Sequence, residues 1–275
     1  MVILIQCKDQ VGLVAAISSV LAKKSINIVS MREHVDMVDN RFFARIVIAG
    51  SADFLLLEQD LKAVLPEGTA INITSQPEKK MVVLVTKDYH CLSDILVRNH
   101  FKTLGATVQC VIGNHANLED ICDRFDIPFH FISHENVTKE LFEHSILEVI
   151  GQYEVDYLVL AKFMRILSAS FVEKFALQII NIHHSFLPAF VGGSPYRQAY
   201  ERGVKLIGAT AHFVTNQLDE GPIIAQQIIP VTHSFTTADM VRSGKEIETA
   251  VLAKALQLVV ENRVLVYKNK TIVFE

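Results

Sequence analysis

The feature that most constrains the fold is a series of short, nearly continuous apolar runs that begins at residue 81 and alternates with helical segments. The first run, residues 81–86 (MVVLVT), is almost entirely apolar, as expected for a strand covered on both faces. Similar runs recur at residues 106–112, 157–161 and 178–182. This alternation predicts a doubly wound, mostly parallel sheet, in which ligands bind outside the carboxyl ends of the strands.

The residues before this series predict a different arrangement. Apolar runs of strand length and segments with helical spacing succeed one another as strand, helix, strand, strand, helix and strand. The expected elements cover residues 2–7, 13–24, 27–35, 41–49, 53–64 and 70–74. Asp53 is the expected N-cap of the second helix. The order βαββαβ over about 75 residues is the ferredoxin-like arrangement.

A polar stretch separates the two patterns. Residues 75–80 (SQPEKK) contain a proline and lie between two apolar runs, which is typical of a linker. We therefore expect a first domain over residues 1–75, a linker at 76–80 and a second domain over 81–275. Two domains also suit a chain of 275 residues.

Charge and composition exclude several classes of protein. The 26 basic and 30 acidic residues give a net charge of −4 and form no long block, which argues against a nucleic-acid partner. No apolar run reaches the ~18 residues of a membrane helix, and the N-terminus lacks the features of a signal peptide. The four cysteines have no C-x-x-C spacing, as in proteins with free thiols. We expect a cytoplasmic protein.

One candidate pair of catalytic residues lies at the end of the run 178–182. Asn181 and His183 are two positions apart, so a strand places both side chains on one face. An amide can stabilise an oxyanion and an imidazole can transfer a proton, which together suit acyl chemistry. The alternative is that both side chains only form hydrogen bonds with loop backbone.

A second candidate is Asp219, which lies shortly before Gly221 and Pro222. A carboxylate in such a tight loop can orient a histidine, as in nucleophilic triads. An Asp in this position is also common as a turn residue. The spacing alone leaves both interpretations open.

Two other site types are compatible with these residue types. A metal site would use His183, His184, His212 and His233 with Asp219 and Glu220, but these lack the i, i+4 spacing of a zinc motif. A serine hydrolase would need a G-x-S-x-G elbow, and the nearby Ser185 is too close to His183 in sequence. We expect no metal and no cofactor.

Several motifs of residues 81–275, in this order, resemble the formyltransferase superfamily and most closely the formyltetrahydrofolate deformylases. They are HCL at 90–92, NH at 114–115, AKFMRIL at 161–167, NIHHSFLPAF at 181–190, PY at 195–196, GATAH at 208–212 and LDEGP at 218–222. The resemblance implies a catalytic trio of Asn181, His183 and Asp219. It also implies a folate site that includes Met164, Arg165, Ile166, Leu167, His212, Thr215, Gln217 and Leu218.

The implied activity is hydrolysis of 10-formyltetrahydrofolate to formate and tetrahydrofolate, which supplies formate for purine synthesis and balances one-carbon folate pools. Members that formylate a ribonucleotide carry a glycine-rich phosphate cradle after the first strand of this domain. Here residues 86–94 (TKDYHCLSD) contain no glycine, so water is the expected acceptor. His184 is expected to point away from His183, and the roles of His90, His184 and His212 are left open.

Residues 1–75 resemble an ACT domain, through Asp9, Gly12 and the pair Asn27-Ile28. Such domains pair between chains and bind amino acids near this first turn, where glycine permits close approach of the backbone. The resemblance implies a homo-oligomer and an effector such as glycine or methionine, bound by Asp9, Gly12 and Asn27. Lys8 stands where the family usually has proline.

Two alternatives remain at this point. One is a formyl transferase to a small amine, which would need an acceptor pocket near His90. The other is a regulatory protein, in which an ACT sensor is joined to a catalytically inactive folate-binding domain. The presence of all three members of the trio argues against the second alternative.

Overall fold

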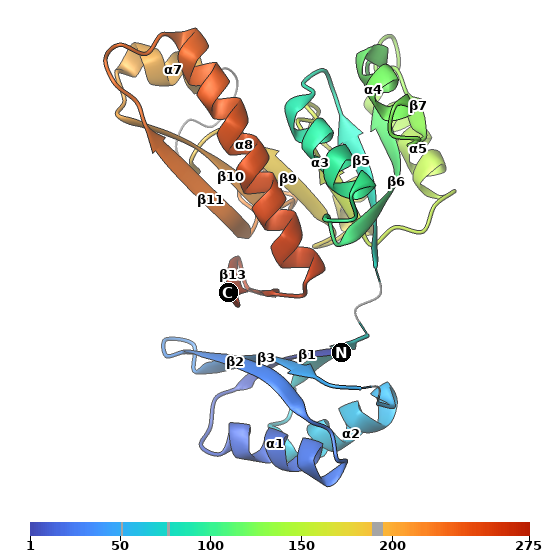
Figure 1. The fold of residues 1–275 in the computed structure, drawn as a ribbon, viewed down its shortest axis with the longest axis vertical. Coiled ribbons are helices and arrows are strands. Elements are labelled where there is room, and N and C mark those ends of the chain that lie inside the picture. The colour runs from blue at the N-terminus through green and yellow to red at the C-terminus, as the bar shows by residue number, and fades with distance from the viewer. Residues whose placement is uncertain (51, 76–77, 189–194) are drawn as a thin grey trace. The chain divides into compact units, whose positions relative to one another are not determined.

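A computed structural model of the chain describes residues 1–50, 52–75, 78–188 and 195–275 (Figure 1). The chain divides into two compact units. The first contains Met1–Pro77 together with Glu261–Glu275, and the second contains Glu78–Val260. Residues 76 and 77 of the expected linker lie outside the described residues, and its last two residues already belong to the strand β5 (Lys79–Val85).

The first unit is built on a four-stranded antiparallel sheet with the order β2-β3-β1-β4. Its elements are β1 (Val2–Lys8), α1 (Leu13–Lys23), β2 (Ile28–Asp36), β3 (Arg41–Ile48), α2 (Phe54–Val64) and β4 (Ala70–Thr74). This is the expected ferredoxin-like order. Asp53 caps α2, because its carboxylate accepts a hydrogen bond from the Leu56 amide at 3.1 Å. The predicted N-cap is therefore confirmed.

Side chains along β3 point alternately to the two faces of the sheet, and those on both faces are buried. Phe42, Ala44 and Ile46 belong to the core that also holds the apolar sides of α1 and α2. Phe43 and Arg45, on the opposite face, are also buried. The second face therefore needs a cover that the two helices do not provide.

Residues of the first unit that follow α8 (Thr237–Val260) supply this cover. They form the antiparallel pair β12 (Val264–Tyr267) and β13 (Lys270–Val273). The Phe43 and Tyr267 rings lie 5.4 Å apart between centroids in an edge-on contact. Arg45 donates two hydrogen bonds of 2.9 Å to the carbonyl oxygens of Asn262 and Glu261. Residues 261–275, which were expected in the second domain, thus belong to the first compact unit.

The second unit contains a seven-stranded sheet with the order β11-β10-β9-β8-β5-β6-β7. Strands β5 to β9 pair in parallel, and β10 and β11 pair antiparallel, which confirms a mostly parallel sheet. Besides β5 the strands are β6 (Ala106–Gly113), β7 (Phe129–Phe131), β8 (Tyr157–Leu160), β9 (Ile179–His183), β10 (Leu206–Phe213) and β11 (Ile223–Pro230).

Helices lie on both faces of this sheet (Figure 1). The remaining helices are α3 (His90–His100), a short 3₁₀ turn (Ala116–Leu118), α4 (Glu119–Asp123), α5 (Lys139–Ile150), α6 (Ala169–Lys174) and α7 (Pro195–Arg202). Helices α3 and α8 pack against each other, while α5 and α6 share a separate core with the parallel strands. Among the described residues, no helix is both long and apolar enough to cross a membrane.

The antiparallel pairing of β9 with β10 aligns the polar residues of the two strands. Asn181 lies opposite His212, and His183 lies opposite Thr210. The chain that follows β10 is held beside β9 by a hydrogen bond of 2.9 Å from the Val214 amide to the Ile179 carbonyl oxygen. This register therefore brings polar side chains of β9 and β10 close together.

A change in the β12–β13 pair tests its contribution to the first unit. We expect Tyr267→Ala to lower the local stability of β3 by about 1–3 kcal/mol, because the ring contact with Phe43 is lost. Hydrogen exchange of the β3 amides, measured on peptides by mass spectrometry, reports this loss. The matched control is Lys62→Ala, which removes a surface ion pair to Glu58 on α2 and should change β3 protection much less. Equal protection in both variants would contradict the covering role.

Candidate functional site

The predicted trio comes together between β9, β10 and the loop before β11. His183 Nδ1 lies 3.4 Å from Asp219 Oδ2. Asn181 Nδ2 lies 3.2 Å from His212 Nε2, which in turn lies 3.8 Å from Asp219 Oδ1. His212 therefore connects the two sides of the trio.

The hydrogen bonds fix which imidazole nitrogens carry protons. His212 Nδ1 lies 2.9 Å from the carbonyl oxygen of Phe213, so this nitrogen is the donor. His212 Nε2 then accepts from Asn181, whose second amide N–H stays available. In the same way His183 Nδ1 donates to Asp219, and its Nε2 keeps a lone pair. His183 Nε2 is buried and has no hydrogen-bond partner among the described residues.

The position of Asp219 depends on a close backbone approach in its loop. A Cβ atom on Gly221 would lie 1.7 Å from the carbonyl oxygen of Phe213, so only glycine fits there. Asp219 itself has a φ of 57°, a conformation that Asp tolerates better than most residues. The loop is also tied to α6, because Asn216 Nδ2 donates to Glu173 at 3.1 Å. These constraints hold the carboxylate against the two histidines.

The trio lines a cavity of about 320 Å³. The cavity wall contains most of the predicted folate-binding side chains: Met164, Arg165, Ile166, Leu167, His212, Thr215 and Leu218. Met164 and Ile166 are about half exposed, with fractions of 53% and 63%. The entrance thus offers an apolar surface that a flat aromatic ligand can cover.

Residues 161–168, which connect β8 to α6, form one wall of this cavity and are anchored at both ends. The Met164 amide donates to Thr86 Oγ1 at 2.9 Å, directly after β5. The Ser168 amide donates to the buried carboxylate of Glu143 at 2.7 Å. The wall is therefore fixed by side chains distant in sequence.

Two residues, Gln217 and His184, lie differently from the expectations. Gln217 does not line the cavity; its side chain is exposed, and its carbonyl oxygen accepts from Thr215 Oγ1 at 3.2 Å. The expectation for His184 is wrong, because its ring lies 5.1 Å from that of His183 between centroids and lines the same cavity. Ser185 is buried outside the cavity lining.

Burial and charge set the protonation of the site. Burial, with the nearby charges of Lys162 and His183, lowers the pKa of His184 to about 4. Burial also lowers the pKa of His212. The hydrogen bond from His183 lowers the pKa of Asp219, although burial acts in the opposite direction. The site at neutral pH thus contains an ionised carboxylate beside neutral His184 and His212.

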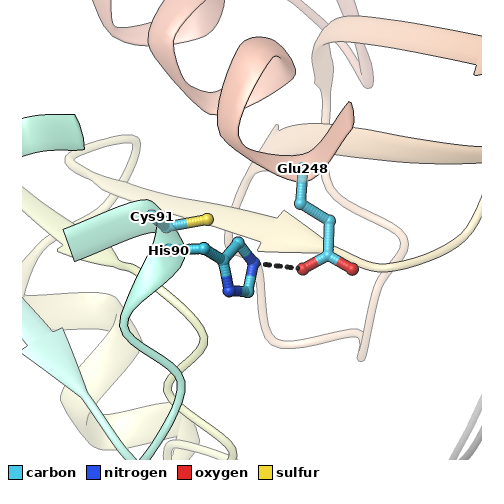
Figure 2. Close-up of side chains that lie close together, drawn as sticks. All are labelled: His90, Cys91 and Glu248. Atoms are coloured by element: carbon cyan, nitrogen blue, oxygen red, sulfur yellow. Dashed lines mark hydrogen bonds and ion pairs between the residues drawn. The ribbon is translucent and has the colours of Figure 1, made fainter. Parts of the chain in front are cut away.

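A second polar cluster lies next to the trio and was not anticipated. His90, Cys91 and Glu248 are the one set of potential metal ligands that the described part of the chain brings together. In Figure 2 a dashed line joins His90 to Glu248, at 2.9 Å, and no interaction is drawn to Cys91. Lys162 Nζ lies 3.2 Å from the same carboxylate oxygen, and burial raises the pKa of the Cys91 thiol. A resident ammonium and a neutral thiol suit a hydrogen-bond network better than a cation site.

In the first unit, the predicted effector residues lie at the ends of two loops. Gly12 directly precedes α1 with a φ of 93°, where a residue with a side chain is strained. The Asp9 amide donates to the carbonyl oxygen of Asn40 at 2.9 Å, and the carbonyl oxygen of Asn27 accepts from Ala49 at 2.9 Å. Lys8 is the last residue of β1.

Two protein-family models match the chain, one in each of its two units. Residues 79–256 match the family model described as formyl transferase, and residues 1–65 match that of the ACT domain. Fold and site therefore define a formyl transferase-type unit joined to an ACT domain.

Individual relatives show to which family within this class the chain belongs. The chain is 47% identical over 272 residues to the formyltetrahydrofolate deformylase of Haemophilus influenzae, covering 99% of this chain and 98% of that protein. A crystal structure of a formyltetrahydrofolate deformylase from Pseudomonas syringae matches with a TM-score of 0.94 and 38% identity, over 100% of this chain and 94% of the other. The chain belongs to the formyltetrahydrofolate deformylase family.

A solved structure with lower similarity is named for formyl transfer and not for deformylation. The glycinamide ribonucleotide transformylase 1 of Symbiobacterium toebii matches with a TM-score of 0.70 and 29% identity. It covers 74% of this chain and 98% of that protein. The formyl transferase fold is thus shared with a protein named as a transformylase.

The electrostatics of the cavity predict an unusual titration. We expect the His184 imidazole to stay neutral until the pH approaches 4, against an ordinary value of 6.5. The folded chain binds this proton less tightly than the unfolded chain, so His184 lowers stability as the pH falls from about 6.5 towards 4. ¹⁵N-histidine NMR spectra can follow the titration, with His184→Gln used for assignment. A midpoint near 6.5 would contradict the described burial.

Proposed function

We propose that this chain hydrolyses 10-formyltetrahydrofolate to formate and tetrahydrofolate, with water as the formyl acceptor. The observation that carries this proposal is the free Nε2 of His183, which faces a cavity beside the available amide N–H of Asn181. The names of the near full-length relatives support the same reaction. The formate released would serve purine synthesis and the one-carbon folate pool.

The cavity suggests how the substrate lies. The pteridine ring is proposed to bind among the apolar side chains of Met164, Ile166 and Leu167, with the N10-formyl group directed at the trio. Thr215 and Leu218 would close the opposite side. This orientation places the formyl carbon within reach of a water molecule bound to His183.

The reaction needs one base, one charged partner and one oxyanion donor. His183 Nε2 removes a proton from water as the oxygen attacks the formyl carbon, and the ionised Asp219 stabilises the imidazolium. Asn181 donates its second N–H to the oxygen of the tetrahedral intermediate. His183 then returns the proton to N10, the C–N10 bond breaks, and formic acid leaves and loses its remaining proton to solvent as formate. His212 orients Asn181 by accepting its other N–H.

A second candidate is formyl transfer to a small amine. The specific observation in its favour is a second cavity, of about 400 Å³, that shares lining residues with the first cavity and is lined by His90. An acceptor molecule could occupy this space. The choice between water and an amine therefore depends on the residues at the junction of the two cavities.

Substitutions in the trio test the hydrolase. We expect His183→Ala to slow formate release by about 10²–10⁴-fold, because base catalysis is lost. Asn181→Ala should slow it by about 10²–10³-fold, because the oxyanion loses a donor. Asp219→Asn should also slow it by about 10²-fold or more. The assay measures formate and tetrahydrofolate from 10-formyltetrahydrofolate without an added amine.

The matched control is His233→Ala, which removes an exposed histidine outside the cavity. It should keep normal turnover. Near-normal activity of His183→Ala would refute its role as the base. Folate binding without formate release by the wild type would refute the hydrolase itself.

The first unit is proposed to bind an amino acid, glycine or methionine, at the loop of Asp9 and Gly12 near Asn27, and to form a homo-oligomer. We expect one of these amino acids to change the rate of formate release by the full chain. Gly12→Val should abolish that response, because valine is strained at a φ of 93°. Light scattering would measure the oligomer. A monomer whose activity ignores both amino acids would contradict this part of the proposal.

A further inference from the structure

The second cavity shares part of its wall with the catalytic cavity. Three side chains, Lys162, Met164 and His184, line both. The remaining wall of the second cavity includes Asp88, His90, Tyr196, Arg197, Lys245 and Glu248. Among the described residues, Lys162, Met164 and His184 therefore form the boundary between the second cavity and the cavity of the trio.

Glu248 is the centre of the hydrogen bonds in this second cavity. Its side chain is 1% exposed, and it accepts from Tyr196 Oη at 2.6 Å and from His90 Nε2 at 2.9 Å. Lys162 Nζ lies 3.2 Å from the oxygen that His90 contacts. Burial alone would raise the pKa of Glu248, but these donors outweigh burial and lower the pKa to about 2. The carboxylate is therefore ionised and has donors at both oxygens.

Both carboxylates in the wall are already paired with lysines of this chain. Glu248 holds the ammonium of Lys162, and Asp88 holds that of Lys245 at 2.9 Å. Simple alkylamines are cations at neutral pH and bind best to an unpaired carboxylate. The cavity walls described here offer an incoming amine no such partner.

Lys162 differs from Lys245 in its position. Lys162 is buried, lies two residues after the end of β8, and lines both cavities. Lys245 is partly exposed and lines only the second cavity. An ammonium has no lone pair, so a protonated Lys162 cannot itself attack a formyl carbon.

We propose that Lys162 determines the acceptor: its ammonium, held by Glu248, occupies the place that an acceptor amine would take, and leaves water as the nucleophile. This inference rests on the proposed hydrolase. In the excluded reaction, an amine nitrogen would bond to the formyl carbon and lose a proton, while the C–N10 bond breaks and N10 gains one. In the permitted reaction, water supplies the oxygen and formate is the product.

The test supplies 10-formyltetrahydrofolate together with a small amine, glycinamide, and measures both formate and the N-formyl product. We expect wild type to release formate at every amine concentration tested. Lys162→Ala should raise the share of N-formyl product by about tenfold or more, in proportion to the amine. The control Lys174→Ala removes the charge of an exposed lysine that lines neither cavity and should leave the partition unchanged.

Lys162→Ala leaves the Glu248 charge buried without its cation and could therefore misfold. A second variant that lacks this charge keeps the inference testable. Lys162→Ala combined with Glu248→Gln removes both charges and should still raise the share of N-formyl product, although less than Lys162→Ala alone, because no unpaired carboxylate is left to hold the amine. Formate release by wild type, with no gain in either variant, would overturn this inference and leave the hydrolase intact. Loss of hydrolysis in both variants without transfer would also overturn it, since Lys162 would then serve hydrolysis itself. N-formyl product formed by wild type beside formate would overturn the inference alone, and N-formyl product without formate would overturn the hydrolase as well.

Discussion

The pairing of β9 with β10 is the constraint on which the site depends. The strands from β7 to β9 pair in parallel, whereas β10 and β11 pair antiparallel. The β9–β10 pair therefore connects the parallel part of the sheet to the antiparallel part. Its register brings Asn181 opposite His212, and the loop after β10 folds back so that Asp219 reaches His183. A shift by one residue would turn these side chains to the other face of the sheet. The geometry of the proposed catalytic site thus depends on backbone register as much as on side-chain identity.

Buried charge in this unit occurs in two neighbouring groups with different consequences. Asp219 contacts His183, whose other nitrogen remains free for chemistry. Glu248 contacts Lys162, His90 and Tyr196. Breaking either buried group by removing one partner leaves an uncompensated charge, which is costly. The first group keeps a lone pair available, whereas the second holds an amine nitrogen in its unreactive form.

The sequence predicted the parts of this structure that follow from local pattern. Period two predicted the shared face of Asn181 and His183, and the apolar runs predicted the parallel strands. The contacts of Glu248 were not predictable, because they join residues of α3, α7, α8 and the end of β8 through tertiary packing alone. A lysine directly after an apolar strand, at Lys162, was the one local signal. The position of Gln217 outside the cavity was not predicted, because an irregular loop has no periodicity from which the direction of a side chain could be inferred.

The β12–β13 pair has a consequence for the order in which the chain folds. Residues 78–260 are inserted into the first unit, between its sheet and the strands that cover one face of that sheet. During synthesis from the N-terminus, Phe43 and Arg45 leave the ribosome early but meet Tyr267 and Asn262 only after the whole insertion has been made. The unit that is begun first is therefore completed last. Until then its sheet exposes an apolar face, which is the period in which a nascent chain is most open to aggregation or to a chaperone.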